Sequence, residues 1–314
     1  MTSKTERPEA TLVVNTQSRR GLALYGRAKQ ELERQGVAVA AAYPVRDASR
    51  IATVVEEAIG SGRRFIIVGG GDGTVSSIAS LFAGKDIVLG LLPLGTANNF
   101  ARGNGIPLDL AGAVRVLSEG RVGQVDLGRV DFSPGGGNAF TNAISIGLSS
   151  AIHRGSPDPI KRAFGRAGYF MVALGRMRSS RPFEAKLELD GRTEHIQALD
   201  IRIANGPYHG GFPALPEASL DSGDLVVRVI PGPSPWALGR VWMRIVLGRS
   251  IDPSLVRIFR AREIGITAEP EQFVSVDGEV VTRTPARISV MPGTLRLMVP
   301  QDAGGVGGAG RPGT

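Results

Sequence analysis

The sequence predicts an α/β domain followed by an antiparallel β domain, and two patterns in the chain lead to this fold class. Residues 11–128 alternate apolar runs of strand length with amphipathic runs of helical length, which favours a parallel sheet covered by helices on both faces. Residues 129–293 contain short alternating runs separated by glycine and proline, a pattern typical of an antiparallel β-sandwich. Residues 301–314 are glycine-rich and almost without apolar side chains, so we expect a disordered tail there.

The elements of the first domain follow from the spacing of its apolar residues. Runs of strand length, some of them rich in β-branched residues, predict buried parallel strands at residues 11–14, 37–42, 65–68 and 87–92. Intervening runs with apolar residues at helical spacing predict helices at residues 23–35, 51–60, 74–82, from residue 98, and at 108–118.

The second part contains shorter runs, which predict strands joined by turns. They lie at residues 124–132, 138–147, 184–189, 195–204, 224–230, 262–268, 272–276, 280–283, 287–291 and 294–299, with a hairpin-like loop at 133–137. Two basic segments of helical pattern, residues 161–178 and 236–249, interrupt these runs. Basic amphipathic helices can lie on anionic membranes, but packing on the β domain with the arginines in solvent is the interpretation that we favour.

The composition bounds the class of protein. Hydrophobic residues make up 42% of the chain and charged residues 21%, as in a globular protein. The absence of cysteine excludes disulfides, thiolate metal ligands and a cysteine nucleophile. The sequence contains neither an apolar leader nor an apolar run of about 18 residues, the length that spans a bilayer. We therefore expect a cytoplasmic protein.

The chain is strongly basic, with a formal net charge of +8 and a pI of about 10.4. This balance favours anionic partners such as nucleotide phosphates, nucleic acid or a membrane surface, although a general enrichment in arginine would produce the same charge. Aromatic residues are only 5% of the chain and are not interleaved with the basic ones. Stacking on single-stranded nucleic acid is therefore not expected.

Two glycine-containing loops carry the clearest chemical signal. The apolar run 65–68 ends in Gly69-Gly70-Gly71-Asp72-Gly73-Thr74, and the run 87–92 ends in Pro93-Leu94-Gly95-Thr96-Ala97-Asn98. Glycines let the backbone turn sharply and bring its N–H groups close to a phosphate. Two adjacent strands that both feed such loops indicate a nucleotide site at the carboxyl ends of a parallel sheet. Taken alone, the first loop is equally well explained as a tight turn between strand and helix.

These motifs, in this order, resemble the bacterial diacylglycerol kinase family, soluble lipid kinases related to sphingosine kinases and more distantly to NAD kinases. The resemblance covers about residues 11–300 and includes the segments 142–147, 205–211 and 277–279. It implies a Rossmann-like nucleotide-binding domain over residues 11–128, rejoined by about residues 294–300. It also implies a β-sandwich domain for a lipid substrate over residues 129–293.

The resemblance also implies roles for individual residues. The nucleotide contacts would be Asn15, Ser18, Gly70, Gly71, Asp72, Gly73, Thr74, Gly95, Thr96 and Asn98. Asp72 and Asp126 would hold Mg²⁺, directly or through water, because a hard cation takes oxygen ligands. Glu279 would be the base that accepts the proton of the acceptor hydroxyl, with Asp277 supporting it. Without the resemblance, Asp277-Gly278 is better explained as a plain hairpin turn.

Several positions depart from the family pattern. Ser76 and Ser77 stand where the family commonly has Asn-Glu, Asn99 stands where it has aspartate, and Ser222 replaces an aspartate of a structural magnesium loop, between Asp221 and Asp224. Fewer carboxylates predict weaker magnesium binding. These changes are compatible with rearranged ligands or with a weakened enzyme.

We therefore expect an ATP- and Mg²⁺-dependent lipid kinase that phosphorylates a lipid hydroxyl at the membrane surface. The alternatives are a non-catalytic nucleotide- or lipid-binding regulator of the same fold and, less favoured, an NAD kinase. The sequence does not identify the acceptor lipid, and a homodimer is compatible with it.

Overall fold

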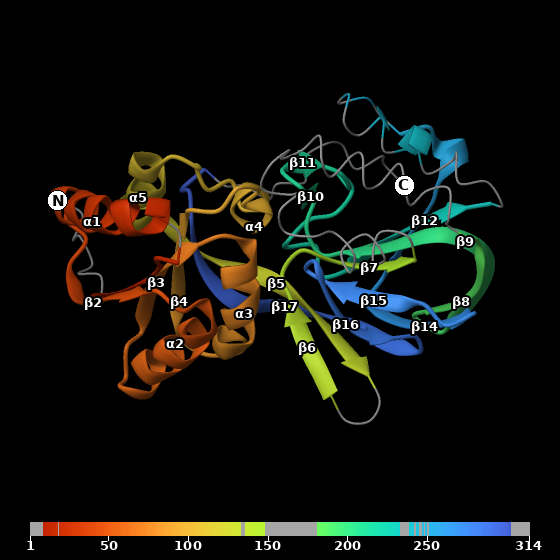
Figure 1. Cartoon of the computed structure of the whole chain (residues 1–314), viewed down its shortest axis with the longest axis horizontal. Helices are drawn as coiled ribbons and strands as arrows, with labels where there is room; N and C mark the ends of the chain where they lie inside the picture. Colours follow the sequence, from red (N-terminus) through yellow and green to blue (C-terminus); the bar gives the residue numbers. More distant parts are fainter. Residues whose placement is uncertain are drawn as a thin grey trace.

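The structure, a computed structural model, describes residues 9–17, 19–132, 136–147, 181–232, 239–241, 243–244, 247, 249 and 251–302. It consists of an N-terminal α/β part and a C-terminal antiparallel sandwich-like part (Figure 1). The fold class predicted from the sequence is therefore confirmed. Ser18, the basic segment 161–178, half of the segment 236–249 and most of the segment 301–314 lie outside the described residues.

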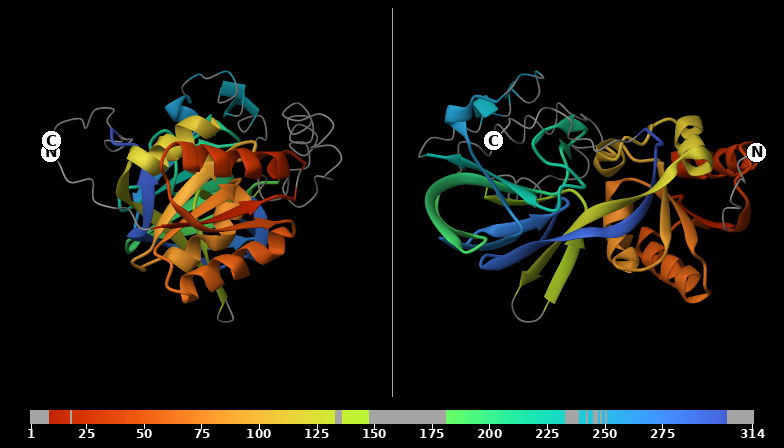
Figure 2. Two further views of the ribbon diagram at one scale, coloured as in Figure 1. Left: turned by 90° about the vertical axis from the view of Figure 1, so that its left-hand side faces the viewer. Right: turned by 180° about the vertical axis from the view of Figure 1, so that it is seen from behind.

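The N-terminal part is a parallel sheet in the order β2-β1-β3-β4. Its strands are β1 (Ala10–Asn15), β2 (Val39–Val45), β3 (Phe65–Gly70) and β4 (Val88–Pro93). Its helices are α1 (Arg19–Arg34), α2 (Ile51–Gly60), α3 (Asp72–Phe82), α4 (Asn99–Gly103) and α5 (Leu110–Glu119), with a short 3₁₀ turn, η1 (Ala48–Arg50). Helices α1 and α5 cover one face of the sheet, and α2 and α3 cover the other (Figure 2).

The C-terminal part is antiparallel throughout. Its strands are β5 (Arg121–Phe132), β6 (Gly136–Phe140), β7 (Ala143–Gly147), β8 (Phe183–Leu189), β9 (Arg192–Ala204), β10 (Tyr208–His209), β11 (Phe212–Pro213), β12 (Leu225–Pro231), β13 (Arg257–Ala261), β14 (Glu263–Glu269), β15 (Phe273–Val276), β16 (Glu279–Arg283) and β17 (Ala286–Val299), with a 3₁₀ turn, η2 (Pro253–Leu255). No helix among the described residues is long and apolar enough to cross a bilayer.

Strands β5 and β17 join the two parts. They pair with each other over most of their length, and the end of β17 pairs in parallel with β4 through Arg296 and Leu297. Figure 2 shows both strands running from the sandwich into the α/β part. Through β17 the strands of both parts form one continuous hydrogen-bonded sheet.

The structure corrects three details of the predicted strands. Residues 138–147 form two strands, because the chain between β6 and β7 turns at Thr141 and Asn142 to bond another loop. Residues 287–299 form one strand with an irregular register between Met291 and Leu295, where two strands were expected. Strands β10, β11 and β13 were not predicted.

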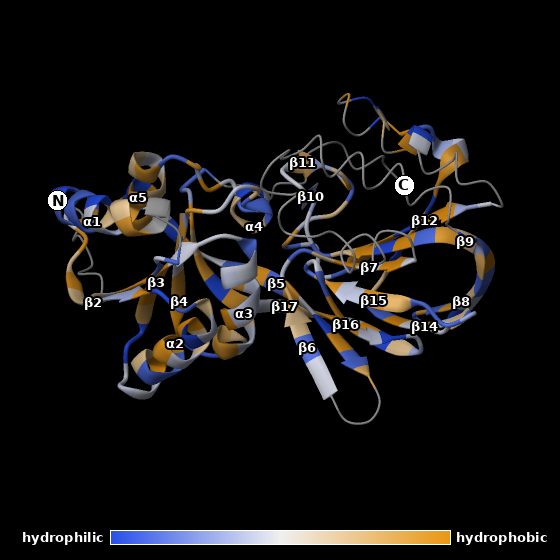
Figure 3. Ribbon diagram, viewed as in Figure 1, coloured by the Kyte–Doolittle hydropathy of each residue, from blue (hydrophilic) through white to orange (hydrophobic). Residues whose placement is uncertain are grey.

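The apolar residues pack into separate cores. One lies between the parallel sheet and its helices, and a second fills the sandwich; along the sandwich strands, hydrophobic and hydrophilic segments alternate in Figure 3. In the second core, the buried ring of Phe140 lies against Gly128, its partner on β5. A Cβ atom at Gly128 would lie 2.0 Å from Cζ of Phe140, so a larger residue at 128 must displace the ring.

We predict that Gly128→Ala lowers the free energy of unfolding by about 1–3 kcal/mol, the usual cost of overpacking a core. Urea denaturation of the purified protein measures this loss. The same substitution made in a Phe140→Leu background should cost clearly less, because the ring that clashes is gone. An equal loss of unfolding free energy in both backgrounds would contradict a clash between residue 128 and the Phe140 ring.

Candidate functional site

The first glycine loop connects β3 to α3. Gly70 has no room for a side chain, because a Cβ atom there would lie 2.5 Å from Cβ of Thr74. Thr74 is buried, and its hydroxyl accepts a hydrogen bond of 3.2 Å from Nδ2 of Asn15 at the end of β1. The structure thus brings Asn15, Gly70 and Thr74 together at the carboxyl ends of the parallel strands, as the nucleotide-site prediction requires. Helix α3 begins here, and the N–H groups of a first helical turn have no intrahelical partner.

The second glycine loop is closed by Asn98. This residue has a left-handed backbone with φ of 49°, and its buried side chain bonds Gly95 in both directions. Oδ1 accepts from the Gly95 N–H and Nδ2 donates to the Gly95 carbonyl, both at 2.9 Å. A Cβ atom at Gly95 would lie 2.5 Å from Cα of Gly71. The two loops therefore touch backbone to backbone, with Thr96 exposed on the second.

Asp72 holds the start of α4. Its Oδ1 accepts a 3.0 Å hydrogen bond from the N–H of Phe100, and its Oδ2 accepts one of 3.3 Å from Nδ2 of Asn99. Burial raises the pKa of the Asp72 carboxyl and the charge of Asp277 acts in the same direction, while the backbone N–H groups of residues 98–100 act in the opposite direction. Asp72 therefore fixes the position of the second loop relative to the first.

Asn99 links the two parts of the chain. Its Nδ2 donates to Asp72, and its Oδ1 accepts a 2.8 Å hydrogen bond from the N–H of Gly211 between β10 and β11. An aspartate at this position has no hydrogen to donate and would set a second carboxylate beside Asp72. Asparagine in place of the family's aspartate at position 99 thus removes a negative charge and allows a direct hydrogen bond to Asp72.

Asp277 lies at the tip of the β15–β16 hairpin, with φ of 47°. Its carboxylate accepts five hydrogen bonds of 2.8–3.0 Å from four residues: Ser76, Thr141, Asn142 and Ala143. Glu279, two residues later, is exposed and has no side-chain hydrogen bond within the described part of the chain. Of the two residues predicted to be catalytic, Asp277 is fully engaged and Glu279 is accessible.

Asp126 is buried in β5. Its two oxygens accept backbone N–H groups of Gly223 and Gly293, each at 2.7 Å. Burial raises the pKa of its carboxyl, with Asp221 and Asp224 nearby acting in the same direction. Asp72 and Asp126 share no hydrogen-bond partner in the ranges that the structure covers, so their joint role as magnesium ligands stays a prediction.

The loop that contains Ser222 is held by protein groups. The Ser222 hydroxyl donates to Oδ1 of Asp224 at 2.7 Å, and Nη1 of Arg260 pairs with the same carboxylate at 2.8 Å. Among the residues described, no three acidic, histidine or cysteine side chains cluster to hold a metal ion. Arg260 supplies the positive charge beside Asp224, so the residues present do not fit a structural cation at this loop.

The sequence assigns no role to two residues that the structure shows to be important for the site, Asn205 and Ser76. The amide of Asn205 is buried and donates to the carbonyls of Asp126 and Thr141 at 2.8 and 3.0 Å, which joins three segments. Ser76 was recognised only as a departure from the family, yet its hydroxyl binds Asp277. Ser18 lies outside the described residues, so its role stays a prediction.

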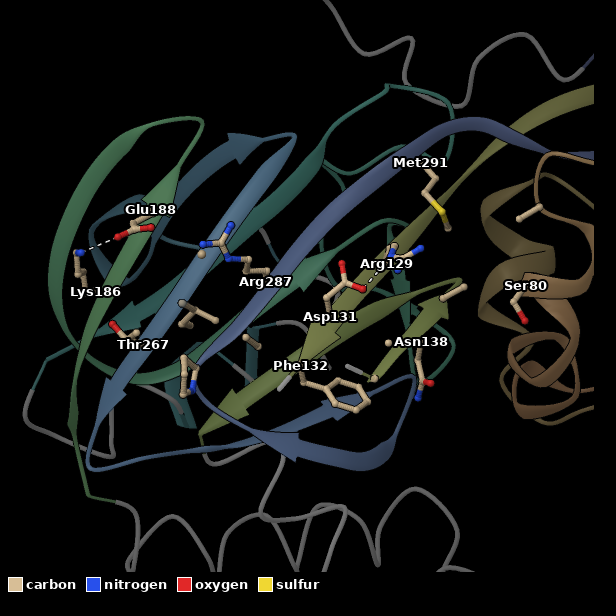
Figure 4. Close-up of a pocket in the computed structure, with 18 residues that line it drawn as sticks. Ser80, Arg129, Asp131, Phe132, Asn138, Lys186, Glu188, Thr267, Arg287 and Met291 are labelled. Atoms are coloured by element: carbon tan, nitrogen blue, oxygen red, sulfur yellow. Dashed lines mark hydrogen bonds and ion pairs between the residues drawn. The ribbon is translucent and has the colours of Figure 1, made fainter. Parts of the chain in front are cut away.

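A hollow of about 980 Å³ lies on the outer face of the sandwich, beside the C-terminal end of α3 (Figure 4). It is lined by the ion pairs Arg129–Asp131 and Lys186–Glu188, at 2.8 and 2.6 Å, with Arg287 between them. The described residues that line it include none of the predicted site residues. This hollow is separate from the candidate site.

We predict that Asp126→Asn lowers the free energy of unfolding by about 2 kcal/mol, because the amide cannot accept both backbone N–H groups as a carboxylate does. Thermal denaturation tests this, with the exposed Asp131→Asn on the same strand as the control, expected to change stability little. EDTA should leave the melting temperature of the wild type unchanged. A stabilisation by Mg²⁺ that is lost in Asp126→Asn would instead place an ion at Asp126.

Comparisons with known proteins agree with this arrangement. Residues 9–130 match the diacylglycerol kinase catalytic domain, and residues 142–299 match the YegS C-terminal NAD kinase beta sandwich-like domain. A probable YegS-like lipid kinase from Pseudomonas fluorescens is 34% identical over 266 residues, which is 84% of this chain and 85% of the relative. A second, from Pseudomonas aeruginosa, is 32% identical over 276 residues, 87% of each chain.

Solved structures support the fold. A crystal structure described as a diacylglycerol kinase from Bacillus anthracis str. Sterne matches with a TM-score of 0.73 and 22% identity, and covers 94% of this chain and 98% of that one. A further structure from the same organism gives a TM-score of 0.79 at 24% identity, with the same coverage. Because both domain families match in order and the curated relatives match over most of their length, the chain belongs to the bacterial diacylglycerol kinase-like family of YegS-like proteins.

Proposed function

We propose that this protein is an ATP- and Mg²⁺-dependent lipid kinase, which transfers the γ-phosphate to a hydroxyl group of a lipid, as a diacylglycerol kinase does. One observation carries the proposal. The hydrogen bond from Ser76 to Asp277 fastens the turn before Glu279 to helix α3, which begins in the first glycine loop. This link supports a site in which Glu279 serves as the base and the first glycine loop binds the phosphates.

The glycine loops are suited to the phosphates of a nucleotide. The first turn of α3 offers backbone N–H groups and the positive end of the helix dipole, both favourable to anions. Gly73 lies in this turn, is exposed, and has no atom within 4 Å of the place where a Cβ would lie. Packing within the protein therefore does not require glycine at 73, whereas close approach of a phosphate to the backbone does.

The transfer step assigns one role to each group. The lipid hydroxyl oxygen attacks the γ-phosphorus, its proton passes to the Glu279 carboxylate, and the bond from the γ-phosphorus to the β–γ bridging oxygen breaks, leaving ADP. Mg²⁺ held at the site would supply positive charge that offsets the negative charge of the phosphates. Asp72 would be the carboxylate that holds this ion, because it lies in the first turn of α3, next to the glycines of the first loop. Asp277 is too fully engaged to act as the base.

The lipid substrate class is supported by the relatives, which are described as probable lipid kinases. The net charge of +8 supports peripheral contact with an anionic membrane, where such a substrate resides. Nucleic acid is not among the partners that we propose, and a homodimer is compatible with the proposal. The acceptor lipid itself is left to the experiment.

A non-catalytic regulator is the second candidate. The Ser77 hydroxyl donates to the carbonyl of Thr74 within its own helix at 2.9 Å, and Asn99 has no charge, so two carboxylates of the family pattern are absent. Such a protein would bind nucleotide without turnover. The experiments below separate the two candidates.

We predict that Gly73→Ala weakens nucleotide binding about tenfold or more, equivalent to about 1.4 kcal/mol or more, while the folded protein keeps its stability. Calorimetric titration with ATP and Mg²⁺, together with thermal denaturation, measures both. Gly60→Ala is the matched control, because Gly60 is also exposed and helical, and a Cβ atom there would likewise have no neighbour within 4 Å. Unchanged binding in Gly73→Ala would place the phosphates elsewhere.

We predict that Glu279→Gln lowers kcat by roughly 10² to 10⁴-fold, the usual contribution of a general base, with nucleotide affinity retained. Transfer of labelled γ-phosphate to mixed lipid vesicles with Mg²⁺ measures this. Glu271→Gln, also exposed in the sandwich, should behave as the wild type. A wild type that binds ATP but labels no lipid would favour the regulator, and a fully active Glu279→Gln would remove Glu279 from the mechanism.

A further inference from the structure

Asp277 is saturated with hydrogen bonds. Oδ2 accepts from the Ser76 hydroxyl and from both the N–H and the hydroxyl of Thr141, and Oδ1 accepts from the N–H groups of Asn142 and Ala143. A carboxylate offers about four lone-pair sites. Asp277 therefore has no capacity left for a substrate proton or a metal ion, and its role has to be exerted through its neighbours.

These bonds fix the position of the turn that precedes Glu279. The N–H of Asp277 also donates to the carbonyl of Ala143 at 3.0 Å, so the turn is bonded to β7 through both its backbone and its side chain. Gly278 continues the turn with φ of 100°, and Glu279 begins β16 opposite Val276. A shift of the Asp277 carboxylate would therefore shift Glu279.

The five donors differ in origin. Four come from residues 141–143, which belong to the same sandwich as Asp277. The fifth, from Ser76, comes from helix α3 across the boundary between the two parts, at 2.8 Å. Ser76 lies one helical turn after Asp72, so it moves with the first glycine loop.

We infer that Asp277 is a positioning residue and that its hydrogen bond from Ser76 couples the nucleotide-binding helix to the placement of Glu279. The inference rests on the proposed kinase function and deepens it. Binding of the phosphates at the start of α3 sets the position of Ser76, which through Asp277 sets the position of the base. Nucleotide affinity does not depend on this link, but productive transfer does.

Asp277→Asn is a poor test, because it places an N–H group against backbone donors and disrupts the turn itself. Ser76→Ala removes a single bond and keeps a good helix former in α3. We expect its kcat to fall about tenfold in the vesicle assay with ATP and Mg²⁺, with unchanged KM for ATP and an unchanged melting temperature. Ser76→Thr, which retains the hydroxyl, should recover most of the rate.

Ser77→Ala is the matched control, because the Ser77 hydroxyl bonds only within α3. It should keep the kcat of the wild type. Full activity of Ser76→Ala would overturn the inference, as would an equal loss in Ser77→Ala.

Hydrogen exchange tests the coupling without turnover. In the wild type, a non-hydrolysable ATP analogue with Mg²⁺ should slow amide exchange in residues 273–283, and in Ser76→Ala it should bind equally well without this effect. A wild type that binds the analogue and transfers no phosphate to any lipid would end the kinase proposal, while the exchange result would still decide the coupling. Equal protection in both proteins, or no binding of the analogue to the wild type, would overturn the inference.

Discussion

Carboxylates that accept backbone N–H groups are the interaction on which the geometry of the site depends. Asp72 holds the start of α4, Asp126 holds the loops at Gly223 and Gly293, and Asp277 holds the chain between β6 and β7. Hydrogen bonds to a charged group are the stronger kind in proteins. Each of these acids therefore fixes the backbone of a loop or of the start of a helix.

The same interaction separates acids that hold the structure from acids that remain available for chemistry. On the strength of motif position, the sequence assigns Asp126 to a metal ion, Asp277 to the support of the base and Glu279 to proton transfer. In the structure, the first two accept several hydrogen bonds each, whereas Glu279 stands exposed one residue beyond a rigid turn. The number of bonds that a carboxylate already accepts thus indicates its role better than its place in a motif does.

Sequence reasoning succeeded where the signal is local. The apolar run of β3 and the glycines that follow it predict a strand, a turn and a helix without any knowledge of the rest of the chain. Sequence reasoning failed where a structural feature depends on a residue far away in the chain. The interruption between β6 and β7 at Thr141 and Asn142 is stabilised by Asp277, about 135 residues later. Ser76 and Asp277 are hydrogen-bonded although 201 positions separate them in the sequence. From the sequence, Asn99 is only the loss of a carboxylate, whereas the structure shows its hydrogen bond with Gly211. Strands β10 and β11, of two residues each, are too short to show a period.

Strand β17 pairs with β4 as well as with strands of the sandwich. As a consequence, the chain is not assembled in the order in which it is synthesised. The α/β part leaves the ribosome first, but β4 receives its outer neighbour only when residues 296–297 have been made. Until then the β4 edge presents unpaired N–H and C=O groups, which other chains can pair with. The domain boundary that is visible in the sequence is therefore not a boundary between units that fold one after the other, and late, long-range pairing of this kind slows folding.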